Sequence, residues 1–116
     1  MIIEKSILDY LLDAGLSVGT NVYCELPVYA PDEYVIVERS GGNQTNHVFQ
    51  ALIIVQSISS VSLYRAMEIN EEVVAAMTRY GEESPDVYSC DLNSNYNYPN
   101  TNTKEYRYQA IFDLNY

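Results

Sequence analysis

The chain has 116 residues and a formal net charge of −10 at pH 7, from 16 acidic residues against 6 lysines and arginines. A chain of this length buries roughly two thirds of its unfolded surface in one core without metal or disulfide support, so we expect a single domain over residues 1–116. The acidity argues against a phosphate-binding surface, because affinity for nucleic acid comes mostly from Lys and Arg that displace counterions.

The N-terminal segment has neither the basic stretch nor the long apolar run of a signal peptide, because Asp9 and Asp13 interrupt its apolar residues. No window approaches the roughly 20 apolar residues of a membrane span. We therefore expect synthesis in the cytoplasm, no membrane partner and reduced thiols at Cys24 and Cys90, with a disulfide between them as the alternative. Two cysteines at this spacing do not suggest a metal site, and no cofactor is expected.

Hydrophobic periodicity in the first half of the chain predicts one helix and three strands. Apolar residues from Ile3 to Leu12 recur at helical spacing, and Gly15 is a suitable stop. Pro27 should end a strand over residues 22–26 or place it at an edge of the sheet, and a second strand covers residues 33–40. Gly41-Gly42-Asn43 then predicts a tight reversal. The run 48–57 is apolar almost throughout, which is typical of a central strand.

The second half of the chain predicts a long helix and two more strands. Helical spacing covers residues 63–80, with Ser60 or Ser62 as the N-terminal cap and Gly81 as the stop. This helix should cover the apolar face of the sheet. A strand over residues 87–92 follows, and the Asn-, Tyr- and Ser-rich tract 93–102 is expected to be a long hairpin tip.

The last segment, residues 103–116, alternates between apolar and polar residues as a half-buried strand does. We expect the long helix to cover one side of it, formed by Tyr106, Tyr108, Phe112 and Leu114. The other side should be free for solvent or a neighbouring subunit, and contains Glu105, Arg107, Gln109 and Asp113. The element order α-β-β-β-α-β-β predicts an α+β fold with two helices and a mainly antiparallel sheet of about five strands.

No residue pattern in the chain indicates an active site. His47 stands alone in a polar segment, with no nucleophile turn in the sequence, so a solvated surface histidine is expected rather than a general base. An enzyme that uses His47 is therefore the third-ranked hypothesis. The polar segments 41–47 and 93–102 are better candidates for contacts with a partner, because exposed tyrosines offer a large contact area at little entropic cost. The candidate contact residues are Asn43, Gln44, His47, Tyr96, Tyr98 and Arg107.

Several strings along nearly the whole chain resemble one family. PDEYVIVERSGG at 31–42, VFQALIIVQSIS at 48–59 and TKEYRYQAIFDLNY at 103–116 are similar to segments of the small tail-completion or tail-terminator proteins of long-tailed bacteriophages and prophages. The end of the chain, where Arg107-Tyr108-Gln109-Ala110 leads into the last strand, carries most of the likeness.

The resemblance implies a structural virion protein at the junction of tail and neck, with no catalytic residues to carry over. Its partners would be other copies of itself in a ring, typically a hexamer, the tail-tube protein and a neck or head-completion protein. The ring would end tube polymerisation and provide the surface for head attachment. DNA would only pass through, and acidic walls would repel it. The candidate channel-facing residues are Glu68, Glu71, Glu72, Glu82 and Glu83.

Two alternatives remain open at this point. Another neck component, such as a head-tail joining or connector protein, would share the size, the acidity and the ring assembly. A small soluble binding module would instead hold a ligand with the loops 41–47 and 93–102.

Overall fold

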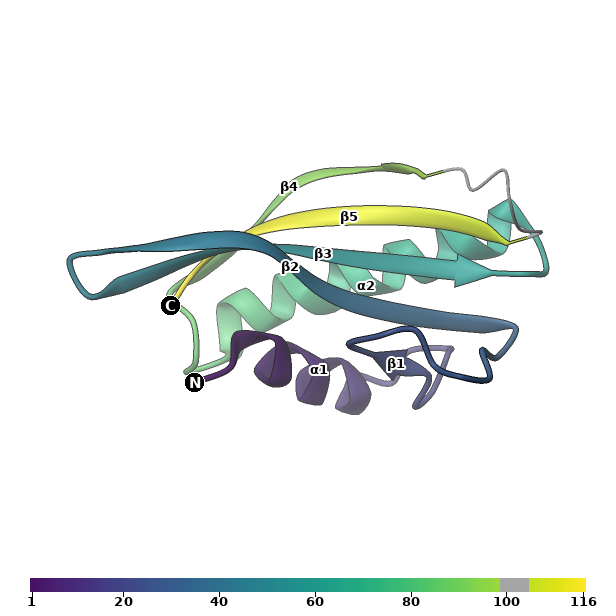
Figure 1. Cartoon of the computed structure of the whole chain (residues 1–116), viewed down its shortest axis with the longest axis horizontal. Helices are drawn as coiled ribbons and strands as arrows, with labels where there is room; N and C mark the ends of the chain where they lie inside the picture. The colour runs from purple at the N-terminus through teal and green to yellow at the C-terminus, as the bar shows by residue number, and fades with distance from the viewer. Residues whose placement is uncertain (99–104) are drawn as a thin grey trace.

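A computed structural model describes residues 1–98 and 105–116 of the chain (Figure 1). It confirms the predicted α+β fold and the order α-β-β-β-α-β-β. The sheet is mixed, in the order β1-β2-β3-β5-β4, with β1 parallel to β2 and every other pair antiparallel. The elements are α1 (Ile3–Asp13), β1 (Val22–Tyr23), β2 (Glu33–Thr45), β3 (Val48–Ser59), α2 (Leu63–Glu83), β4 (Ser89–Asn97) and β5 (Tyr106–Asn115).

Both helices cover the same face of the sheet (Figure 1). The α1 helix contacts β1 and β2, whereas α2 lies against β3, β4 and β5. The buried face of α1 is formed by Ile3, Ile7 and Leu11, spaced so that all three project from one side of the helix. They join one core with residues of α2 and the sheet. This core is the main source of folding free energy, because it removes most of the large apolar side chains from water.

The α2 helix begins where the sequence predicts but ends later. The Ser62 hydroxyl accepts a hydrogen bond from the Arg65 amide at 3.0 Å, which confirms Ser62 as the cap. The helix continues through Gly81 to Glu83, so the predicted stop at Gly81 is wrong. A Cβ atom at Gly81 would lie 2.8 Å from Cβ of Cys90, so glycine here allows β4 to approach the helix closely.

The reversal between β2 and β3 also lies later than predicted. The β2 strand continues through Gly41-Gly42-Asn43 to Thr45, and the chain turns at Asn46 and His47, whose φ angles are 50° and 67°. A two-residue turn with positive φ matches the twist of the flanking strands, and Asn tolerates that conformation well. A side chain at Gly42 would overlap the Gln50 carbonyl oxygen, which explains a glycine inside a strand. Segment 41–47 is therefore mostly paired strand rather than loop.

The second predicted loop is also partly a strand. Residues 93–97 of the expected tip belong to β4, which pairs with β5 and contains an irregularity between Leu92 and Ser94. The Tyr98 amide donates to the Arg107 carbonyl at 2.9 Å, so the pairing continues one residue further. The rest of the expected tip, 99–102, lies outside the described residues. The first strand is shorter than predicted, since β1 covers only Val22–Tyr23.

The alternation of the last strand is confirmed for its central part. Ala110, Phe112 and Leu114 are buried in the core under α2. The expected cover over Tyr106 is wrong: Tyr106 pairs with Ser59, which precedes the first turn of α2, and it is 45% exposed.

The sheet face that bears no helix is more buried than expected. Gln109 was expected to be free for solvent, but it is buried between Gln56, whose amide donates to it at 3.4 Å, and the Tyr96 hydroxyl, which accepts from it at 2.7 Å. Nearby, Tyr34, Ile36 and Ile58 form a second small apolar cluster. The amide side chains are satisfied by one another, which removes the cost of burying them.

Candidate assembly surface

The end of the β2–β3 hairpin, residues 40–50, projects past the rest of the sheet (Figure 1). The last pairings of β3 with the C-terminal segment are Gln50 with Asn115 and the backbone bonds between Phe49 and Tyr116, at 2.8 and 2.9 Å. Beyond Phe49, β2 and β3 pair only with each other in the described part of the chain. We call residues 40–50 the hairpin end. Almost all of its side chains are exposed.

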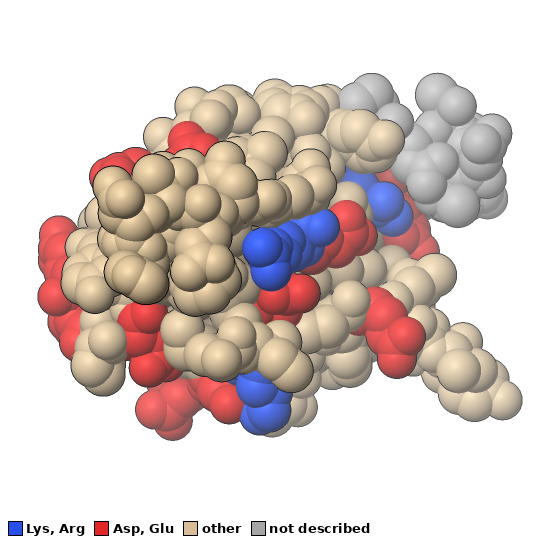
Figure 2. All heavy atoms as spheres, turned by 60° about the vertical axis from the view of Figure 1, so that its left-hand side comes forward, with Lys and Arg blue, Asp and Glu red and all other residues tan. Residues whose placement is uncertain are grey.

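The hairpin end contains His47 but none of the four charged residue types that make the chain as a whole strongly acidic. No Asp, Glu, Lys or Arg occurs anywhere from Ser40 to Tyr64. Figure 2, in which this side of the molecule comes forward, shows a large area without charged side chains, bordered by both acidic and basic side chains. Contact with a protein at the hairpin end would therefore remove no Asp, Glu, Lys or Arg side chain from water. The desolvation of such side chains is a cost that often opposes association.

The base of the hairpin end lies against the C-terminus. The rings of Phe49 and Tyr116 stack with centroids 5.4 Å apart and planes at 18°. Met1, Arg39 and His47 line the same hollow, which has a volume of about 380 Å³. Phe49 keeps 42% of its surface exposed, so the stack steadies the hairpin without burying it.

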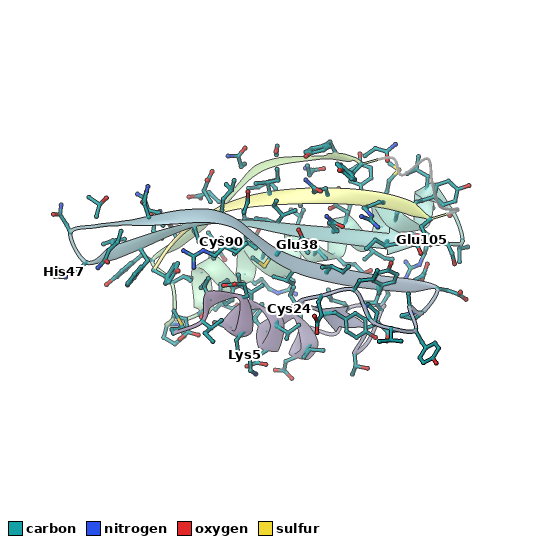
Figure 3. The ribbon with its side chains drawn as sticks, viewed as in Figure 1. Lys5, Cys24, Glu38, His47, Cys90 and Glu105 are labelled. Atoms are coloured by element: carbon teal, nitrogen blue, oxygen red, sulfur yellow. The ribbon has the colours of Figure 1, made fainter. Side chains whose placement is uncertain are left out.

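Three of the predicted contact residues, Asn43, Gln44 and His47, lie in the hairpin end. His47 is exposed at the tip, far from the labelled carboxylates Glu38 and Glu105 (Figure 3). Within the described residues, the His47 side chain has neither a hydrogen bond nor a salt bridge, although it shares the hollow with Tyr116. Exposed polar side chains at this position are better suited to hydrogen bonds with another molecule than to catalysis.

The other predicted contact residues lie at the opposite end of the sheet. Tyr96 pairs with Gln109 and so lies level with Gln56 and Ile36, near the start of β2. Tyr96 and Tyr98 are 40% and 46% exposed. They therefore cannot join the hairpin end of the same chain in a single contact patch.

Arg107 contributes to the packing of the uncovered sheet face. Its side chain is 18% exposed, and a guanidinium nitrogen lies 4.0 Å from the Glu105 carboxylate. The same carboxylate accepts a hydrogen bond from the Tyr34 hydroxyl at 2.9 Å. Burial, reinforced by this hydrogen bond to an anion, raises the pKa of Tyr34 to about 12.

The five predicted channel carboxylates are spread along α2 rather than gathered. Glu72 accepts hydrogen bonds from the Ser17 amide at 3.0 Å and from its hydroxyl, and so ties a loop to the helix. Glu68 lies 3.7 Å from Arg65. Glu71 is exposed, whereas Glu82 and Glu83 lie in the last helical turn. At about 1.5 Å per residue, the two ends of this set are some 20 Å apart.

A second set of carboxylates lies on the uncovered face of the sheet. Asp91 pairs directly with Asp113, and the Asn93 amide donates to Asp113 at 2.8 Å. Glu38 lies on the same face, and all three carboxylates are exposed. These carboxylates are not among the predicted site residues, because the pairing of Asp91 with Asp113 depends on a register that local sequence patterns do not reveal.

The two cysteines are free thiols near opposite edges of the sheet. Cys24 is exposed in the loop after β1, whereas Cys90 is partly buried in β4 (Figure 3). Burial, with a smaller effect of Asp91, raises the pKa of the Cys90 thiol to about 12. A thiol with such a pKa is almost wholly protonated at neutral pH and therefore unreactive.

Neither a metal cluster nor a membrane helix is found in the described ranges. Within 1–98 and 105–116, no group of three or more His, Cys, Asp or Glu side chains could hold a metal ion. Neither of the two helices is long and apolar enough to cross a membrane.

Comparison with known proteins gives one kind of match. No protein-family model and no curated protein matches the chain. Among solved structures, it is similar to a chain in the "Virion of native gene transfer agent (GTA) particle", with a TM-score of 0.69 and 15% sequence identity, over 94% of this chain and 90% of that chain. At this identity the likeness establishes a common fold.

Proposed function

We propose that residues 1–116 form one tail-terminator-like domain, a structural protein of a phage-like virion. The observation that carries the proposal is the fold likeness to a virion chain, which extends over most of both chains. The likeness of the 31–42, 48–59 and 103–116 strings to tail terminators supports the more specific role. Copies of the chain form a ring that caps the tail tube, ends its polymerisation and presents a surface to the neck.

The surface chemistry supports this role in two ways. The hairpin end is uncharged, projecting and rich in amides, as a contact with a neighbouring subunit or the tube requires. The remaining surface is acidic, which prevents DNA from binding the wall of a conduit. Either the α2 carboxylates or the set Glu38, Asp91 and Asp113 would face that conduit. The proposed role includes no catalytic step and no cofactor.

The mass of the purified protein, measured alone and after mixing with tail-tube protein, tests the proposal. We expect a closed oligomer, or one that forms on the tube, and tubes that stop growing once the protein is added. A chain that stays monomeric and leaves tube growth unchanged would contradict it.

Another neck component is the second candidate, because the same fold and acidity would suit it. The position of the protein in the particle separates the two. Labelled protein at the end of the tail tube supports the terminator, whereas labelled protein against the portal, with normal tail lengths in its absence, supports the neck component.

A further inference from the structure

We propose that neighbouring copies join head to tail by strand pairing. The free β2 edge, which we define as residues 38–45, pairs with the outer edge of residues 89–94 of β4 of the next copy. This inference deepens the proposed function and rests on it, since it names the surfaces that close the ring.

Both edges are open within residues 1–98 and 105–116. In the order β1-β2-β3-β5-β4, β4 is the last strand of the sheet. At the other side, β1 pairs only with Val35 and Ile36, so β2 has no neighbour on that side from Glu38 onward. Backbone N–H and C=O groups on an open edge form a ready template for another strand.

The two edges match in level and in direction. We call residues level when they lie in the same row of cross-strand partners. Asn43 is level with Gln50, Asn115 and Ser89, and Gly41 is level with Asp91. Three successive antiparallel pairings also make β2 antiparallel to β4. A second copy placed beside the first in the same orientation therefore brings β4 antiparallel to the free β2 edge, at the same level.

The edges have only part of the usual protection against pairing. Natural edges are commonly guarded by lysine, proline or several charges, and by bulges. The β2 edge has one irregularity, next to Ser40, and the β4 edge has one, next to Asn93. The stretches that would come together in the contact, 41–45 of one copy and 89–92 of the next, are regular. Neither edge contains a lysine or a proline.

Electrostatics permits a second copy at these edges. The free β2 edge carries one acidic and one basic residue, Glu38 and Arg39, and sums to zero; β4 carries only Asp91, for a charge of −1. Most other surfaces of a chain with net charge −10 would repel another copy. The edges are thus the places where two identical chains approach with the least repulsion.

Large apolar side chains are exposed in the loop after β1 and at the β4 side of the sheet. The loop after β1 exposes Leu26, Val28 and Tyr29, which are 64%, 92% and 92% exposed. On the other side, Tyr96 of β4 and Tyr98, the residue after its end, lie near the level of β1. Joining the two edges brings these side chains together, so that apolar burial adds to the backbone hydrogen bonds.

Two different edges on one chain give a heterologous contact. Such a contact repeats from copy to copy and closes into a ring when the rotation between neighbours allows it. It also pairs the two edges named above, the free β2 edge and the outer edge of β4, within the described residues.

Disulfide trapping tests the pairing. In a chain with Cys24→Ser and Cys90→Ala, cysteines are introduced as Asn43→Cys with Ser89→Cys, and in a second chain as Asn43→Cys with Asp91→Cys to cover a shift in register. Within one chain, positions 43 and 89 are separated by three strand spacings, about 14 Å, which no disulfide spans. Mild oxidation of the assembled protein with tube protein should therefore convert most of the monomer into a ladder of cross-linked multimers.

Single-cysteine chains provide the control. Each alone should give no cross-link, and an equal mixture of the Asn43→Cys and Ser89→Cys chains should give dimers but nothing larger. Dimers from one single-cysteine chain alone would show a symmetric contact and overturn the inference. Normal assembly without any cross-link in either double variant would overturn it too, while leaving the proposed function intact. Failure of the wild-type chain to assemble with tube protein would contradict both.

Discussion

The base and the end of the β2–β3 hairpin consist of the same two strands but have opposite surroundings. At the base, Val35, Val37, Ile53 and Val55 are at most 1% exposed under the helices. In the hairpin end, residues 40–50, nearly every side chain is exposed and none is charged. The base thus holds the fold together, whereas the sequence of the end contributes little to folding and is available for contact with other molecules.

The largest expected difference between base and end concerns aromatic side chains. Phe112, which pairs with Ile53 in the core, is 1% exposed, and Phe49 is 42% exposed. We expect Phe112→Ala to lower the free energy of unfolding by about 4 kcal/mol and Phe49→Ala by about 1 kcal/mol. Urea unfolding followed by circular dichroism measures both values. Equal losses would remove the distinction between base and end.

Glycine substitutions sharpen the comparison. Replacing a helical glycine by alanine usually stabilises a helix by about 1 kcal/mol. At Gly81 we expect the opposite, a loss of about 2 kcal/mol, because the new methyl group meets the Cys90 backbone and Cβ. The control is Gly41→Ala in the hairpin end, where a Cβ meets nothing within 4 Å. A stabilised Gly81→Ala variant would show that α2 and β4 are packed less closely than described.

The alkaline stability of the protein depends on the base of β2 through Tyr34. The folded chain raises the pKa of Tyr34 from its ordinary value near 10 to about 12, so the folded state holds this proton more tightly than the unfolded state does. The resulting stability is present below pH 10 and is lost as the pH rises to 12, with a size of at most about 2 kcal/mol. The free energies of unfolding of wild type and of the Tyr34→Phe variant should therefore become equal as the pH rises through this range. Tyr29→Phe, at a 92% exposed position, should follow wild type throughout.

The smallest expected effect lies in the turn of the hairpin end. His47 has a φ of 67°, a conformation that glycine adopts without strain. His47→Gly creates an Asn-Gly turn and should raise the free energy of unfolding by up to about 1 kcal/mol. The matched control is Thr45→Gly, which lies within β2 and should lower it. A large loss from His47→Gly would mean that the imidazole has a structural role at the tip.

Local patterns in the sequence were sufficient for the elements and for most of the core. The alternation that contains Phe112 and Leu114 depends only on neighbouring residues, and the prediction of their burial is confirmed. The glycines at positions 42 and 81 were wrongly predicted to be a turn and a helix stop. Gly42 instead allows close approach to Gln50 across the hairpin, and Gly81 allows close approach to Cys90 of β4. A glycine's local signal is the same whether it serves a turn or a tight contact.

The candidate surface could be predicted only in part, for the same physical reason. The polar segments around Asn43 and Tyr96 were identified by composition, but their separation to opposite ends of the sheet follows from strand order and register. The facing carboxylates of Asp91 and Asp113 also depend on the register. The burial of Gln109 depends on the partners that Gln56 and Tyr96 provide across the sheet.

Hydrogen exchange tests most directly whether the hairpin end is the assembling part of the molecule. Amide exchange would be compared between the free chain and the chain bound to tail-tube protein. We expect amides of residues 40–50 and of β4 to become protected on assembly, with those of the base, such as Ile53 and Val55, slow in both states. Unchanged exchange in the hairpin end, with new protection along α2, would contradict the account.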